Sequence, residues 1–441
     1  MSHIEPFRAL RYDTGRVALS SVATQPYDKI TPEMQEHYYT SSPYNLVRII
    51  LGKRQPSDNP ADNPYTRARA CFGEWREGGI LRQDPEPSIY RYLQRFVVPG
   101  SGVELERQGF IALGKIEDYS SGVVFRHEQT LAKPKADRLE LLRATRAHFG
   151  QVFMLYNDPE REIEWCLGPR GAPDAETRDE YGVLHQVSRI SDPGIIDLVR
   201  SKMRAKQLII ADGHHRYETA LAYRNERRQQ AQSAARPAKL TPGPELRPYE
   251  FVMMTLVNMD SPELVILSTH RVVDGLEDFS PERFRRGASE FFSVEEADPG
   301  INAERVAAIL KEAGRGGTAL VAVLRDRAFL LSRPHSPAAA FQNVSLRQQG
   351  LDVVQLHKGL LENVLGISEE AIRDQKNVSY IRDAGEALSR VRSGGADIAF
   401  LMNPVGIRQM RQVAFAGEVM PQKSTDFYPK LLSGLTIYAL E

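Results

Sequence analysis

An apolar run that ends in an Asp-Gly pair and continues as a helical pattern is the feature that most restricts the fold of this chain. Residues 208–211 have the sequence Leu-Ile-Ile-Ala, a short β-branched segment typical of a buried strand. The residues around Ala220 and Leu221 favour a helix that starts near His215. Proteins of the α/β class bind ligands at the carboxyl ends of strands, where the start of the next helix favours an anion.

The turn between this strand and helix carries five residues suited to binding or chemistry: Asp212, Gly213, His214, His215 and Arg216. Gly213 lets a ligand approach the backbone, and Arg216 has the donors to hold phosphate or carboxylate oxygens with two parallel bonds. We therefore predict Asp212, His214 and His215 as catalytic residues. Gly213, His215 and Arg216 are predicted to bind phosphate. In the alternative interpretation the histidines only cap the helix.

The composition is that of an ordinary globular protein that handles small molecules. At 441 residues the chain is longer than one core usually sustains, which favours two domains. Its 57 basic and 57 acidic residues give no overall field to attract nucleic acid or an anionic membrane, so neither partner is expected. Cys71 and Cys166 have no metal-ligand spacing. With no signal-like or membrane-spanning segment, we expect a cytoplasmic protein; its oligomeric state is open.

Strand and helix patterns alternate along both halves of the chain. Hairpin patterns occur near residues 88–113 and 318–331, so we predict an α/β class tending to α+β, with two mixed domains. A stretch rich in proline at 237–248 is predicted to be a linker. The expected N-terminal α/β domain is then 1–236 and the C-terminal one 249–441.

A second polar cluster precedes a predicted helix at 135–149. His127, Glu128 and Thr130 are predicted to bind substrate, and Lys135 and Arg138 to bind phosphate at the helix entry. A solvated helix cap remains the alternative. The segment His127-Glu128 is not a zinc motif, because the second histidine of a His-Glu-x-x-His pair is absent.

A third polar cluster lies between two prolines near the C-terminus. Its donors Lys423, Ser424, Tyr428 and Lys430 suit an oxygen-rich substrate, although an ordinary surface loop fits as well. Asp28, at a predicted strand boundary, is a further catalytic candidate. The sequence contains no Gly-x-x-x-x-Gly-Lys-Ser/Thr loop, no Gly-x-Gly-x-x-Gly and no Gly-x-Ser-x-Gly. His148, His185 and His357 lie in apolar patterns and are interpreted as structural.

Several of these blocks together resemble the domain-of-unknown-function family 1015. They are Phe7–Tyr12, Gln25–Ile30, Asn45–Arg48, His127–Thr130, Pro134–Leu139, Ala211–Arg216 and Met420–Leu435. The family usually has two prolines before its Tyr-Asp pair, and Gln25 replaces the first of them here. The segment Asp212–Arg216 also resembles the phosphate-binding strand-to-helix motif of the ParB/sulfiredoxin-like superfamily, which includes free serine kinases. This second resemblance implies such a fold for the N-terminal domain.

The same resemblance implies a phosphotransferase that uses ATP or ADP with Mg²⁺, the metal's protein ligands being unknown. Its acceptor would be a small hydroxylated metabolite, with free L-serine the first candidate. Asp212 or Asp28 would accept the hydroxyl proton or bind Mg²⁺, and the lysines near the C-terminus would hold a carboxylate or a distal phosphate. A phosphatase acting on small phosphoesters and a non-catalytic nucleotide-binding regulator remain the alternatives.

Overall fold

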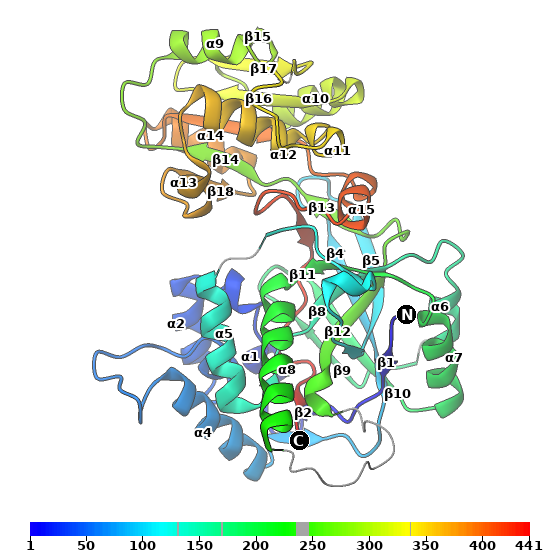
Figure 1. Cartoon of the computed structure of the whole chain (residues 1–441). Helices are drawn as coiled ribbons and strands as arrows, with labels where there is room; N and C mark the ends of the chain where they lie inside the picture. The colour runs from blue at the N-terminus through cyan, green and yellow to red at the C-terminus, as the bar shows by residue number, and fades with distance from the viewer. Residues whose placement is uncertain (130–131, 169–170, 235–246, 336) are drawn as a thin grey trace. The chain divides into compact units, whose positions relative to one another are not determined.

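The computed structural model describes residues 1–129, 132–168, 171–234, 247–335 and 337–441 (Figure 1). They form two compact units. Unit 1 contains residues 1–126, 130–265 and 429–441, and unit 2 contains 127–129 and 266–428. Thr130 and most of the predicted linker at 237–248 lie outside the described residues.

This division corrects the predicted boundary between residues 236 and 249. The strand after the predicted linker, β12 (Phe251–Asn258), lies inside the main sheet of unit 1, between β5 and β8. All eight of its residues are buried, as expected for a strand covered on both faces. The C-terminal residues 429–441 also belong to unit 1. Burial of these two segments in one core therefore outweighs the local change in composition.

The main sheet of unit 1 has the order β6-β11-β8-β12-β5-β4-β10-β9, with β1 paired to β5. The pairs β6–β11 and β8–β12 are parallel and the others antiparallel. The strands of unit 1 are β1 (Ile4–Glu5), β2 (Leu10–Tyr12), β3 (Leu81–Gln83), β4 (Ile89–Val97), β5 (Glu104–Lys115), β6 (Val124–Phe125), β7 (Ala147–His148), β8 (Val152–Tyr156), β9 (Ala175–Arg178), β10 (Leu184–Ile190), β11 (Leu208–Asp212), β12 and β21 (Tyr438–Ala439).

The helices of unit 1 are α1 (Leu19–Val22), α2 (Pro32–Ser41), α3 (Val47–Ile50), α4 (Pro64–Glu77), α5 (Ala132–Thr145), α6 (Glu162–Cys166), α7 (Pro193–Met203) and α8 (His214–Ala234). Short 3₁₀ turns are η1 (Tyr27–Lys29), η2 (Tyr119–Ser121) and η3 (Pro248–Glu250). The predicted strand at 208–211 and the helix after it are confirmed as β11 and α8. The long helix α8 lies beside α5 (Figure 1), and Tyr217 and Ala220 anchor it in the core of the sheet.

Unit 2 is built on an antiparallel sheet with the order β15-β17-β16-β19-β14-β18. Its strands are β14 (His270–Val273), β15 (Ser293–Ala297), β16 (Ala319–Val323), β17 (Ala328–Ser332), β18 (Val378–Ile381), β19 (Ile398–Met402) and β20 (Asp426–Tyr428), while β13 (Val265–Leu267) spans the division. Its helical segments are α9 (Pro281–Ser289), α10 (Ala303–Ala313), η4 (Gly314–Gly316), α11 (Leu346–Gln349), α12 (Asp352–Val354), a π-helix (Gln355–Val364), α13 (Glu369–Arg373), α14 (Ala384–Arg392) and α15 (Ile407–Phe415).

The predicted α/β class with α+β character is confirmed. Unit 1 has a mixed sheet with helices, and unit 2 has an antiparallel sheet with helices packed on its apolar residues. Within the described parts of the chain, every helix is too short or too polar to span a lipid bilayer.

Candidate functional site

The turn after β11 holds Arg216 in a fixed position. Gly213 has a φ of +89°, and a Cβ atom placed there would lie 2.9 Å from Nε of Arg216. The guanidinium is folded back over this glycine, where Nη2 donates to Oδ2 of Asp212 at 2.7 Å and Nη1 donates to the carbonyl oxygen of Gln151. Glycine is required here both by its backbone conformation and by this close approach.

The charges around Asp212 are mainly positive. Nζ of Lys430 lies 3.4 Å from Oδ1 of Asp212, and the Lys430 side chain is only 8% exposed. Burial alone would raise the pKa of the Asp212 carboxyl, but the positive charges of Lys430 and Arg216 outweigh it and hold the pKa well below its usual value. Lys29 and His214 act in the same direction. The Asp212 carboxylate therefore faces two largely buried cations, Arg216 and Lys430, with further positive charge from Lys29, an arrangement that attracts a further anion.

A pocket adjoins this turn, and we call it the Arg216 pocket. It encloses about 570 Å³ when the solvent at its open mouth is included. Two guanidinium groups, Arg138 and Arg216, lie among apolar and small residues. The full lining is Pro26, Tyr27, Ile50, Arg138, Leu141, Leu142, Ala147, His148, Phe149, Gly150, Arg216, Thr219 and Ser433. Oγ1 of Thr219 is buried and has no hydrogen-bond partner among the described residues.

Tyr27 and Arg138 form one wall of the Arg216 pocket. Cζ of Arg138 lies 4.2 Å from the centre of the Tyr27 ring, a cation–π contact. Burial raises the pKa of Tyr27 to about 12, so its hydroxyl stays neutral. Arg138 also donates to the carbonyl oxygen of Ile50 at 2.5 Å and pairs with Asp137. Its guanidinium is therefore held in place from two sides.

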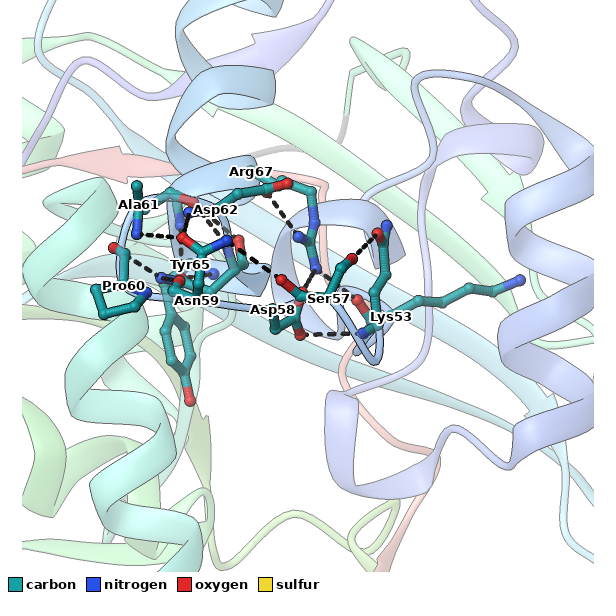
Figure 2. Close-up of polar contacts among 12 residues, drawn as sticks. Lys53, Ser57, Asp58, Asn59, Pro60, Ala61, Asp62, Tyr65 and Arg67 are labelled. Atoms are coloured by element: carbon teal, nitrogen blue, oxygen red, sulfur yellow. Dashed lines mark hydrogen bonds and ion pairs between the residues drawn. The ribbon is translucent and has the colours of Figure 1, made fainter.

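The contacts of Asp137 extend this support to helix α4. The hydroxyl of Tyr65 donates to Oδ1 of Asp137 at 2.7 Å, and Tyr65 lies in the first turn of α4. Figure 2 shows the loop before this helix and the hydrogen bonds by which Arg67 links residues of that loop. Arg67 donates to Asp58 at 2.8 Å, to Asp62 at 2.7 Å and to the carbonyl oxygen of Lys53 at 2.9 Å. The loop thus fixes the start of α4, which positions Tyr65 against Asp137.

The structure brings some of the predicted site residues together in unit 1. Arg138 and Arg216 line one pocket, and Lys430 joins Asp212. Asp28 is exposed in η1, directly after the pocket residue Tyr27. His214 is buried and His215 is half-buried at the start of α8. Lys135 pairs with Glu218 at 3.3 Å, and it is not among the residues that line the Arg216 pocket.

The other predicted substrate residues meet in unit 2. Oε1 of Glu128 accepts hydrogen bonds from the backbone N and from Oγ1 of Thr425, both at 3.0 Å. Nε2 of His127 lies 2.8 Å from the same hydroxyl. Oγ of Ser424 donates to the carbonyl oxygen of Pro421 at 2.5 Å. Hydrogen bonds therefore join the loop at His127 and Glu128 to the loop at Ser424 and Thr425, and this contact is a structural junction within unit 2.

Lys423 and Tyr428, the remaining predicted substrate residues of unit 2, make contacts through a backbone carbonyl and an aromatic ring. The carbonyl oxygen of Lys423 accepts from the buried Arg271 at 3.1 Å, and the guanidinium of Arg382 lies 5.5 Å from the ring centre of Tyr428. Their predicted role in substrate binding stays a prediction.

Comparison with models of protein families shows which family the chain belongs to. The model of a family described as "Protein of unknown function (DUF1015)" matches residues 4–354. The chain belongs to this family. The match contains the whole β11–α8 turn and ends at the last residue of α12, so the π-helix and the residues after it lie beyond it. A comparison with curated proteins found no match.

Solved structures give only distant likenesses. A conserved hypothetical protein from Pyrococcus furiosus is 12% identical at a TM-score of 0.33, covering 69% of this chain and 87% of that one. A free serine kinase in complex with AMP is 14% identical at a TM-score of 0.34, covering 69% and 83%. A C-terminally truncated SbnI from Staphylococcus aureus is 9% identical at a TM-score of 0.34, covering 73% and 85%. Scores this low carry no inference about the activity of this member of the DUF1015 family.

Sequence reasoning missed several residues of the site. The positive charge of Lys29 helps to lower the pKa of Asp212, and Thr219 and Phe149 line the Arg216 pocket. For Thr219 a signal was present, since it lies three residues after Arg216 and hence on the same face of α8. The apolar wall of the pocket gave no signal of its own, because its residues look like ordinary core positions.

His148 gives this site a predicted sensitivity to acid. It lines the Arg216 pocket and stacks on Tyr438 at 5.9 Å, and burial lowers its pKa to about 4. The unfolded chain would bind this proton near the ordinary value of 6.5, so stability falls as the pH drops from 6.5 towards 4. The full shift corresponds to about 3 kcal/mol.

We therefore expect His148→Phe, which keeps an aromatic ring, to lose less stability between pH 7 and pH 4 than the wild type, by about 3 kcal/mol in urea unfolding. His37→Phe, at an exposed position of α2, serves as the control and should keep the pH dependence of the wild type. An unchanged pH dependence of the His148 variant would show that its imidazole does not stay neutral in the folded protein.

Proposed function

We propose that unit 1 binds a nucleotide in the Arg216 pocket and transfers its terminal phosphoryl group to a small hydroxylated metabolite, with free L-serine the first candidate acceptor. The observation that carries the proposal is the fixed guanidinium of Arg216 beside Lys430, at the start of helix α8. Preorganised cations at a helix N-terminus suit the phosphate groups of a nucleotide. The resemblance of residues 212–216 to the phosphate-binding ParB/sulfiredoxin-like motif agrees with this assignment.

The apolar part of the Arg216 pocket suits a nucleoside base. Leu141, Leu142 and Phe149 form an apolar wall, and the Arg138–Tyr27 pair offers a flat surface for stacking. The unpartnered hydroxyl of Thr219 offers a hydrogen bond to a polar edge of the base. The nucleotide would then lie with its base against this wall and its phosphates at Arg216. Either ATP or ADP suits this chemistry.

Of the two candidate carboxylates, Asp28 suits the role of proton acceptor better than Asp212. The pKa of Asp212 is held well below its usual value and its oxygens face Arg216 and Lys430, so it is a weak base. Asp28 is exposed and follows Tyr27 at the pocket wall. In the proposed step the substrate hydroxyl oxygen forms a bond to phosphorus and the bond from phosphorus to the leaving nucleotide breaks. Asp28 receives the hydroxyl proton.

Mg²⁺ usually binds through one or two carboxylates together with phosphate oxygens and water. Asp212 does not fit this role, since two cations already face it, whereas the exposed carboxylate of Asp28 does. When bound, the ion would neutralise charge on the transferred group. Among the described residues no group of three or more His, Cys, Asp or Glu side chains could hold a metal on its own.

The test incubates purified protein with ATP or ADP, Mg²⁺ and a panel of amino acids and polyols, and measures phosphorylated product. We expect Asp28→Asn to lower kcat by at least about 100-fold while the nucleotide Kd stays unchanged. Asp197→Asn, which removes an exposed carboxylate on α7, is the matched control. Rescue of the Asp28 variant by excess Mg²⁺ would assign Asp28 to the metal, and a shifted pH profile would assign it to the proton.

Other outcomes would contradict the proposed transfer. Phosphate released from small phosphoesters, without transfer to a hydroxyl, would make the protein a phosphatase. Nucleotide binding without turnover for any acceptor would make it a nucleotide-binding regulator. Absence of nucleotide binding would leave the Arg216 pocket without its proposed ligand.

A further inference from the structure

A second pocket lies entirely within unit 2, and we call it the π-helix pocket. It encloses about 1050 Å³ when the solvent at its mouth is included. The residues that give it its chemical character come from three elements: His357, Lys358 and Glu362 from the π-helix, Glu369 and Arg373 from α13, and Tyr380 from β18. The junction of the two predicted substrate loops borders it through Gln129 and Gln422. None of these residues takes part in the phosphoryl transfer proposed for unit 1.

The π-helix is the first indication that the pocket binds a ligand. Runs of i→i+5 hydrogen bonds are rare and are frequently found at functional sites. Here the π-helix covers ten residues, Gln355–Val364, and its wider turn presents Lys358 and Glu362 to the same pocket. Nζ of Lys358 lies 2.9 Å from Glu362 and 3.4 Å from Glu369. This side of the pocket therefore holds two carboxylates against one ammonium group, an excess of one negative charge.

One pocket residue of α13, Arg373, carries the opposite charge. Arg373 lines the same pocket, and the nearest carboxylates of its own helix region, Glu370 and Asp374, lie at 3.9 Å and 3.8 Å. These distances are too long for hydrogen bonds, so the donors of the guanidinium stay available to a carboxylate ligand. The pocket therefore holds charges of both signs. The carboxylates of Glu362 and Glu369 lie beside Lys358, and the guanidinium of Arg373 makes no hydrogen bond among the described residues.

Two polar residues of the π-helix pocket, Tyr380 and His357, carry no charge. The ring of Tyr380 lines the pocket, and its hydroxyl oxygen is buried with no hydrogen-bond partner in the part of the chain that the structure describes. Burial and the neighbouring Arg271 lower the pKa of His357 well below its usual value, so this imidazole is neutral. A buried hydroxyl without a partner indicates a place where a ligand completes the hydrogen bonding.

We propose that the π-helix pocket binds a small zwitterion, a molecule of amino-acid size with one ammonium and one carboxylate group. Its ammonium group would lie against Glu362 and Glu369, and its carboxylate would pair with Arg373. A ligand of a single charge would satisfy only one side of the pocket. The site is independent of the nucleotide site proposed for unit 1.

The test measures binding of a panel of L-amino acids to the full-length protein by calorimetry. Each hit is compared with its decarboxylated amine and with its deaminated acid. We expect both single-charge analogues to bind at least about 10-fold more weakly than the amino acid, and Glu362→Gln and Arg373→Gln to lose a similar factor. Glu312→Gln and Arg315→Gln change an exposed pair of the same residue types in unit 2, and they should bind as the wild type does.

A variant in unit 1 separates this proposal from the proposed phosphoryl transfer. Asp28→Asn should leave amino-acid binding at the π-helix pocket intact even where it abolishes turnover. Binding that is lost in the unit 1 variant but kept in Glu362→Gln would overturn the zwitterion site. So would equal binding of the amine or the acid alone, and so would the absence of any amino-acid binding at millimolar concentration.

Discussion

Asp212→Asn should destabilise the protein by about 3 kcal/mol, because it leaves two largely buried cations without their counter-charge. Arg216 is 13% exposed and Lys430 8% exposed, and both point their charge at this carboxylate. For a protein of this size, the melting temperature should fall by about 3–5 °C. Added phosphate should then stabilise the variant more than the wild type, since an anion replaces the missing charge. Thermal melts over a phosphate series measure both effects.

The exposed pair Asp197–Arg200 on α7 provides the control, and Asp197→Asn should change stability by less than about 1 kcal/mol. The pH dependence gives a second check. Because the pKa of Asp212 lies below its usual value, its contribution is present above about pH 4 and is lost as the pH falls further. Equal phosphate stabilisation of the variant and the wild type would show that phosphate does not take the place of the Asp212 carboxylate.

Gly213→Ala should abolish nucleotide binding at a moderate cost in stability. The φ of +89° costs a non-glycine residue about 1–2 kcal/mol. The new methyl group would also meet the Arg216 guanidinium at 2.9–3.0 Å. That guanidinium is the far end of a flexible side chain, so it would move away and give up its bond to Asp212. The expected result is a loss of nucleotide affinity of at least about 100-fold in fluorescence titration.

Gly122→Ala is the control that separates the cost of backbone strain from the effect of displacing the Arg216 side chain. Gly122 has a φ of +66° with no atom within 4 Å of the position of a Cβ, so only the backbone cost applies. This variant should lose stability to a similar extent yet bind nucleotide as the wild type does. Equal affinity of the Gly213 and Gly122 variants would mean that the position of Arg216 does not matter for binding.

The local pattern of the sequence was enough to predict the central element of the candidate site. The β-branched run at 208–211, the Asp-Gly pair and the following helical residues specify a strand, a turn and a helix through interactions within a few residues. The same turn contains Arg216, which lines the Arg216 pocket because the turn fixes where the first helical side chains lie. Its predicted role in phosphate binding stays a prediction.

Long-range contacts decided what the local pattern could not. Lys430 meets Asp212 across 218 residues of sequence, and β12 joins the sheet of unit 1 although a proline-rich stretch precedes it. The loop at 127–138 looks continuous in the sequence, yet His127 belongs to unit 2 and Arg138 lines a pocket of unit 1. Composition and periodicity report only neighbours along the chain. Burial and charge pairing between distant segments determine which of the predicted residues share a site, and these depend on the tertiary structure alone.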